Sequence, residues 1–127
     1  MRAKDAVEAS DSLRHAAGEL AVLSERLDRP SSSGQVLGAL MDAQRSIEHA
    51  LRELAQWHEC TIPGMHFAEH HDESALGVST VIKQLELACQ EAAGLREILS
   101  RAYEGSGVVR WFDEEQESSA HPILPVD

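Results

Sequence analysis

Residues 57–74 concentrate the side chains of this chain that are able to do chemistry. The stretch reads WHECTIPGMHFAEHHDES and holds four of the chain's seven histidines, one of its two cysteines and four acidic residues. Imidazole and thiolate groups are common ligands of Zn²⁺, which usually takes four of them in a tetrahedron. The stretch therefore offers one candidate zinc site, and its ligands would be His58, Cys60, His66 and His70.

A second metal arrangement comes from spacing along helices. His49 and Glu53 lie four residues apart, as do His66 and His70, and residues four apart share a helix face. This pairing resembles part of the hemerythrin pattern, in which a helical bundle holds two irons. The chain departs from that pattern because residues 72–103 contain no histidine. A metal-binding bundle that holds zinc or two irons is therefore the alternative function.

The same stretch also fits a polar crossover between two helices. Pro63 and Gly64 signal a turn, and Asp72 is a good N-cap for the next helix. Cys60 is a weak candidate nucleophile because no oxyanion site is evident beside it, and the nucleotide-binding and hydrolase-elbow motifs are absent from the sequence. We therefore expect no catalytic residue and no enzyme, and we favour the crossover over a metal site.

Three heptad-patterned segments must position the crossover, at residues 3–28, 34–57 and 72–103. Apolar residues recur there at alternating spacings of three and four, as in helices that lie along one another. The predicted seam of the second segment is Val36, Leu40, Ala43, Ile47, Ala50, Leu54 and Trp57. The predicted seam of the third is Val78, Val81, Leu85, Ala88, Ala92, Leu95, Leu99 and Ala102, widened by Ile82 and Cys89. The predicted fold class is all-α, an up-down-up bundle of three long helices within residues 1–104.

Residues 105–127 change in character and form a predicted C-terminal arm. Gly105-Ser106-Gly107 predicts a hinge, and the apolar residues Val109, Trp111 and Phe112 follow it. Tryptophan is enriched among the residues that dominate binding energy at protein interfaces, so these three are the candidate partner-binding residues. The alternative is that they fold back onto the bundle, because exposed aromatic patches are rarely left uncovered. The acidic, proline-containing end is expected to be extended or disordered.

Composition limits the function further. The formal net charge of −11 argues against direct nucleic-acid binding and favours a basic or apolar protein partner. The same charge allows a third function, mimicry of nucleic acid. No apolar run approaches the length of a membrane span and the N-terminus does not resemble a secretion signal, so we expect a cytoplasmic protein with reduced cysteines. The excess of arginine over lysine favours a GC-rich bacterial genome.

The sequence thus predicts a non-enzymatic protein-interaction module, of an adaptor, chaperone-like or regulatory kind. The third helix is longer than its neighbours and would leave part of its apolar seam uncovered. Helical subunits commonly pair across two-fold axes, so we also expect a homodimer. No cofactor is expected.

Overall fold

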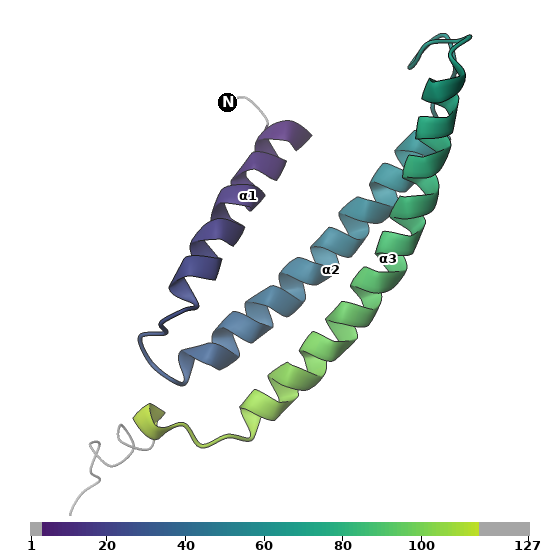
Figure 1. Ribbon diagram of the computed structural model, residues 1–127. Coiled ribbons are helices and arrows are strands. Elements are labelled where there is room, and N and C mark those ends of the chain that lie inside the picture. The colour runs from purple at the N-terminus through teal and green to yellow at the C-terminus, as the bar shows by residue number, and fades with distance from the viewer. Residues whose placement is uncertain (1–3, 115–127) are drawn as a thin grey trace, which may run out of the picture. The chain divides into compact units, whose positions relative to one another are not determined.

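The computed structural model describes residues 4–114 of the chain (Figure 1). These residues form three long helices and no strand, and the helices are α1 (Ala6–Leu23), α2 (Ser32–Glu59) and α3 (Asp72–Gly107). The prediction of an all-α fold is therefore confirmed. The end of the chain that is predicted to be extended or disordered, SSAHPILPVD (118–127), lies outside the described residues. Among the helices described, none combines the length and apolarity needed to cross a membrane.

The chain divides into two compact units. One consists of residues 34–109 and contains nearly all of α2 and α3, and the other joins the segment before residue 34 to the segment after residue 109. In the second unit α1 begins at a capping box: the Glu8 backbone N–H donates to the Asp5 carboxylate at 2.8 Å, and the Asp5 N–H donates to the Glu8 carboxylate. The helix ends at Leu23, five residues before the predicted end at Asp28.

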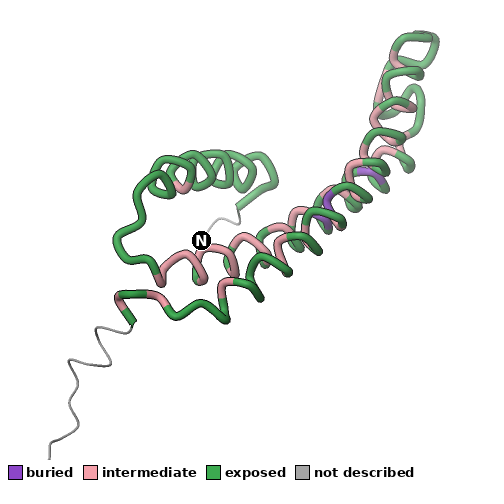
Figure 2. The backbone as a smooth tube through the Cα atoms, turned by 60° about the horizontal axis from the view of Figure 1, so that its bottom comes forward, coloured by how far each residue is buried: buried purple, intermediate pink, exposed green. Residues whose placement is uncertain are grey.

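In the first unit, α2 and α3 lie side by side and antiparallel, as an α-helical hairpin (Figures 1 and 2). The most buried positions in the described part of the chain are Ala55, Ala92 and Glu48, all three on the hairpin (Figure 2). Two small residues at the helix contact let the backbones approach closely, and a carboxylate lies in the same contact. The core of the hairpin is therefore narrow and partly polar.

The face of α2 that α3 covers lies one position away from the predicted seam. The buried and half-buried contact row is Leu37, Met41, Gln44, Glu48, Leu51, Ala55 and His58. Leu54 and Trp57 of the predicted seam are instead 49% and 56% exposed. Val36, Leu40 and Ile47 of the predicted seam are half-buried, so the prediction holds in part on this helix. It left out Gln44 and Glu48, which both find polar partners on α3.

The predicted seam of α3 is correct in one row and incomplete in the other. Val78, Leu85, Ala92 and Leu99 are buried or half-buried, as predicted. The second contact row runs through Ile82, Cys89 and Arg96. In the row predicted for that role, Leu95 and Ala102 are exposed.

The ends of α3 also differ from expectation. His71 is the N-cap, and its ring accepts a hydrogen bond from the Ser74 N–H at 3.2 Å, whereas Asp72 is the first helical residue. The predicted hinge at Gly105-Ser106-Gly107 instead forms the last turn of α3, and Val108 is the C-cap. An imidazole nitrogen can accept a backbone N–H as a carboxylate does, and glycine is tolerated in a terminal helical turn.

Candidate functional site

The crossover between α2 and α3 is a tight turn built around Gly64. Gly64 adopts φ +85°, a left-handed conformation that glycine reaches without a steric penalty. Its N–H donates to the Phe67 carbonyl at 2.7 Å, and the Met65 N–H donates to the Ile62 carbonyl at 3.0 Å. These backbone bonds hold the histidine-rich segment in one conformation, so the positions of its imidazoles follow from the turn.

Two of the crossover histidines accept a hydrogen bond from a backbone N–H at ring nitrogen Nδ1. The Ile62 N–H donates to His66 Nδ1 at 2.9 Å, and the Ser74 N–H donates to His71 Nδ1 at 3.2 Å. A neutral imidazole whose Nδ1 accepts a hydrogen bond carries its proton on Nε2. Neither nitrogen of His66 then offers a lone pair to a metal, so in this conformation His66 shapes the turn instead.

His58 is in the opposite tautomeric state. Its Nδ1 lies 2.7 Å from the Leu54 carbonyl, which can only accept, so Nδ1 carries the proton and Nε2 keeps its lone pair. The rings of His58 and His66 both pack edge-on against Trp57, with centroids 5.0 and 5.9 Å from it. The crossover therefore gathers two imidazoles around one indole.

The predicted metal ligands do not gather into a metal-binding cluster. Within residues 4–114, no group of three His, Cys, Asp or Glu side chains is placed to hold one ion. Cys60 and His70 are exposed, and so are His49 and Glu53 of the second arrangement. What the structure shows at the crossover is a hydrogen-bonded turn.

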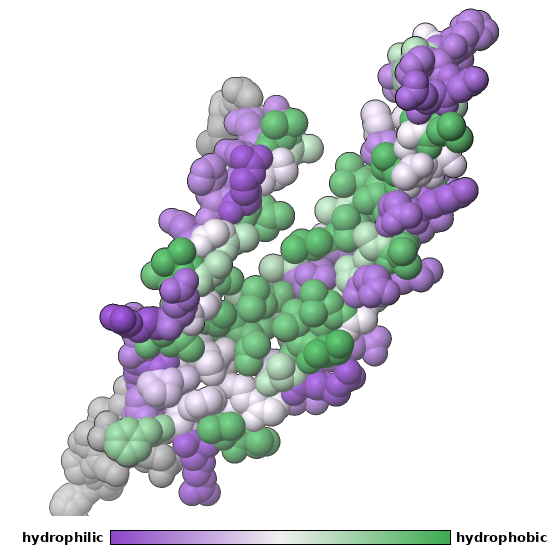
Figure 3. All heavy atoms as spheres, in the orientation of Figure 1, coloured by the Kyte–Doolittle hydropathy of each residue, from purple (hydrophilic) through white to green (hydrophobic). Residues whose placement is uncertain are grey.

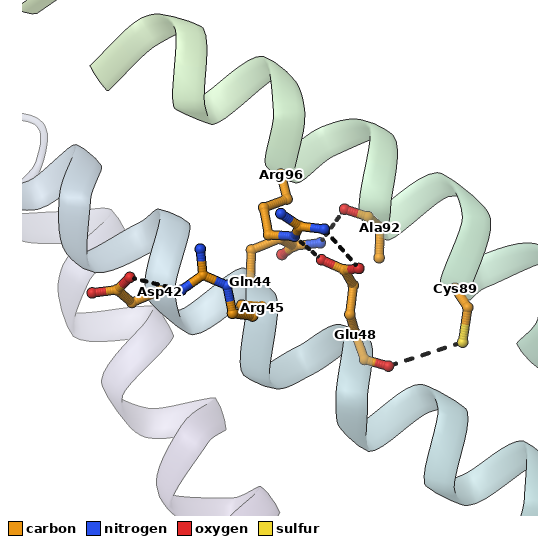
Figure 4. A network of polar contacts seen from close by, with 7 residues as sticks. All are labelled: Asp42, Gln44, Arg45, Glu48, Cys89, Ala92 and Arg96. Atoms are coloured by element: carbon orange, nitrogen blue, oxygen red, sulfur yellow. Dashed lines mark hydrogen bonds and ion pairs between the residues drawn. The ribbon is translucent and has the colours of Figure 1, made fainter. Parts of the chain in front are cut away.

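A polar network crosses the hairpin near its middle (Figure 4). The Glu48 carboxylate of α2 accepts from Arg96 of α3 through Nε, and also through Nη2 at 3.4 Å. Gln44 Nε2 donates to the Ala92 carbonyl at 3.3 Å. The hydrogen bond from Arg96 lowers the pKa of Glu48, although burial opposes this effect in part. Glu48 is therefore held ionised, and its bonds fix which residues of α2 and α3 face one another.

A second polar contact anchors the C-terminal arm to the segment before α2. The Asp113 carboxylate accepts from the Ser31 N–H at 3.0 Å, from Ser31 Oγ at 2.5 Å and from Arg29 Nε at 3.0 Å. The Ser31 hydroxyl is the main cause that lowers the pKa of Asp113, again against the opposing effect of burial. Three donors thus converge on one carboxylate.

Two of the three predicted partner-binding residues are exposed. Phe112 is 70% exposed and Val109 is 42% exposed, whereas Trp111 is half-buried. Sequence reasoning missed Trp57 as a surface residue, since it was assigned to the seam of α2. The sequence carries one signal that Trp57 lies outside the contact. A second row with the same heptad spacing runs through Leu37, Met41, Gln44, Glu48, Leu51 and Ala55 and does not include Trp57.

Comparisons with protein families, curated proteins and solved structures give no match to this chain. What its surfaces do is therefore inferred from their own residues.

Proposed function

We propose that this protein is a non-enzymatic interaction module of the cytoplasm, with an adaptor, chaperone-like or regulatory role. It binds a protein partner through the C-terminal arm and pairs with a second copy of itself. The observation that supports the first part most directly is the contrast between Phe112 and Asp113. The aromatic side chain is 70% exposed, while the adjacent carboxylate is held by Ser31 and Arg29.

An anchored backbone makes an exposed aromatic ring a better binding element. A free tail would lose conformational entropy when a partner ordered it, whereas a segment already held by Asp113 loses less. Val108 and Val109, 83% and 42% exposed, add apolar surface close by in the sequence. The arm thus supplies a short apolar anchor of the kind that interfaces use.

The net charge of −11 bears on the chemistry of the partner. A basic partner would be steered toward the acidic surface, and its association rate would fall as salt screens the attraction. The expected partner therefore combines an apolar pocket for Phe112 with a basic rim.

Site-specific photo-cross-linking tests the proposal. A benzophenone amino acid replaces Phe112 in the full chain, expressed in the source organism, and the matched control places it at exposed Arg101 on α3. We expect one adduct of defined mass from position 112 and none of that mass from position 101. With the partner identified, Phe112→Ala should weaken its binding roughly tenfold or more. The same adducts from both positions, or binding unchanged by Phe112→Ala, would refute a role for the arm.

A further inference from the structure

The hairpin carries two apolar rows beside its helix contact, and their residues are half-buried or exposed. The exposed members are Ala43, Ala50, Leu54, Trp57, Leu95 and Ala102. On α2, each residue of this row directly precedes a residue of the contact row, so it is turned from the contact by about 100°. The same is true of α3, where the row directly precedes Ile82, Cys89, Arg96 and Tyr103. We name these two rows together the apolar flank, and its members are Val36, Leu40, Ala43, Ile47, Ala50, Leu54, Trp57, Val81, Ala88, Leu95 and Ala102.

Both rows of the apolar flank lie on the same side of the hairpin. On each helix the row lies one residue before the contact row, which is the same direction of rotation about the helix axis. Because α2 and α3 run antiparallel, this rotation brings both rows to the same side of the hairpin. Figure 3 shows apolar side chains gathered along α2 and α3. Among the residues of the flank, Leu54, Trp57 and Leu95 are 49%, 56% and 46% exposed. The flank is therefore one continuous face.

The composition of the apolar flank distinguishes between partners. None of its eleven residues is charged, in a chain with twenty-two acidic residues. A basic partner would find one carboxylate at the edge of the flank, that of exposed Glu91, which directly precedes Ala92 of the contact row, and none within the flank. Large and small residues alternate along α2, as in Leu40, Ala43, Ile47, Ala50 and Leu54, and such a surface can interdigitate with a copy of itself.

The size of the flank matches one side of a stable dimer. α2 has 28 residues and is about 42 Å long, and two adjacent helices are about 20 Å wide. The face therefore measures on the order of 800 Å², which is about what each partner buries in a standard interface. The 18 residues of α1 make a rod about 27 Å long and 10 Å wide. The area of this rod is about a third of the area of the face, so α1 is too small to cover the whole face.

We infer that the apolar flank is the surface on which a second copy of this chain binds. The inference rests on the self-association in the proposed function and gives it a location, separate from the arm. The two hairpins pack flank to flank about a two-fold axis and form a four-helix core, in which Leu54 and Ala50 of each copy become buried. Because both copies carry a charge of −11, screening by salt should tighten the dimer, opposite to its effect on a basic partner.

Sedimentation equilibrium of the full-length protein tests this inference across concentration and salt. We expect a dimer for the wild type, and a dissociation constant that rises at least about a hundredfold in Leu54→Glu and in Ala50→Glu. Both residues are exposed in the single chain, so circular dichroism should show unchanged helix content. Leu87→Glu is the matched control, because it introduces the same charge as the two test variants. Leu87 is 48% exposed and lies about 100° around α3 from Ala88, away from the flank.

The outcomes separate the location from the self-association itself. A wild-type chain that stays monomeric at high protein concentration would overturn both. A wild-type dimer that Leu54→Glu and Ala50→Glu leave intact, or that Leu87→Glu disrupts equally, would overturn the apolar flank alone. Neither result depends on whether the arm captures a partner.

Discussion

Arg96 of α3 donates hydrogen bonds to the carboxylate of Glu48 on α2, in the middle of a helix contact where Glu48 is 5% exposed. A buried ion pair adds little net stability compared with apolar residues of similar size, because both charges lose water. Its loss is costly for another reason, since removal of one partner leaves the other charge without compensation. The pair thus acts chiefly on specificity: a slip of either helix would leave a buried carboxylate unpaired.

The first prediction is that removal of Arg96 alone and removal of Glu48 alone lower the stability by different amounts. The Arg96 side chain is 32% exposed and reaches water without Glu48, whereas the Glu48 side chain is only 7% exposed. Arg96→Met should therefore lower Tm more than Glu48→Met, and the double variant should be more stable than Arg96→Met alone. Thermal and urea unfolding of all four proteins measures the coupling. Additive effects would show that the two side chains do not interact.

The second prediction concerns acid. The pKa of Glu48 is lowered in the folded hairpin, chiefly by the hydrogen bond from Arg96, so the folded state binds this proton less readily than the unfolded state. The contribution to stability is present above the unfolded value of about 4.3 and is lost as the pH falls through the lower folded value. Urea unfolding from pH 7 to pH 3 should show a loss of stability below about pH 4.3 that is smaller in Glu48→Met. Equal pH dependence in both proteins would contradict this assignment.

Heptad spacing predicted the helical class and the approximate extent of α2 and α3, because apolar period and turn residues are local properties. It failed to select the contact face of α2. Two adjacent rows compete there, and the row with Gln44 and Glu48 is less apolar than the row with Ile47 and Leu54. The polar row makes the contact because Ala92 and Arg96 satisfy its side chains, and that pairing is visible only once the second helix is in place.

The histidines of the crossover show a similar limit. Composition allowed a metal site as the alternative to a polar crossover, and the roles of His66 and His71 depend on which backbone N–H groups the turn directs toward their rings. A left-handed Gly64 sets that direction, and the Pro63-Gly64 signal predicts a turn without fixing its hydrogen bonds. The anchor of the arm was beyond prediction for another reason, since Ser31 and Asp113 are 82 residues apart.

The third prediction contrasts two glycines inside helices. A Cβ on Gly94 of α3 would meet no atom within 4 Å, whereas a Cβ on Gly38 of α2 would lie 3.0 Å from the ring of Tyr103. Gly94→Ala should therefore stabilise the chain by up to about 1 kcal/mol, the difference in helix propensity. Gly38→Ala should gain less, because the Tyr103 ring has to move. Urea unfolding of both variants measures the difference, and an equal gain would show that Tyr103 yields at no cost.

The fourth prediction concerns the anchor of the arm at Asp113. Asp113→Ala removes the acceptor of the Ser31 N–H and Oγ and of Arg29 Nε, so residues 29–31 should open more often. Hydrogen exchange at the Ser31 amide should then accelerate by roughly tenfold or more, because exchange reports local opening. Glu114→Ala is the control, since it changes the neighbouring carboxylate and leaves Asp113 in place.

The direction of the Asp113 pKa shift sharpens this last test. The Ser31 hydroxyl lowers the pKa of Asp113, so the anchor should persist as the pH falls below the range in which an ordinary aspartate becomes protonated. Protection of the Ser31 amide in the wild type should therefore be lost only at a pH below about 3.9, after correction for the intrinsic exchange rate. Protection lost already above that pH, or unchanged in Asp113→Ala, would mean that another group holds the arm. Loss of the anchor should also weaken partner binding at Phe112 while leaving the dimer intact, because the apolar flank and the arm share no residue.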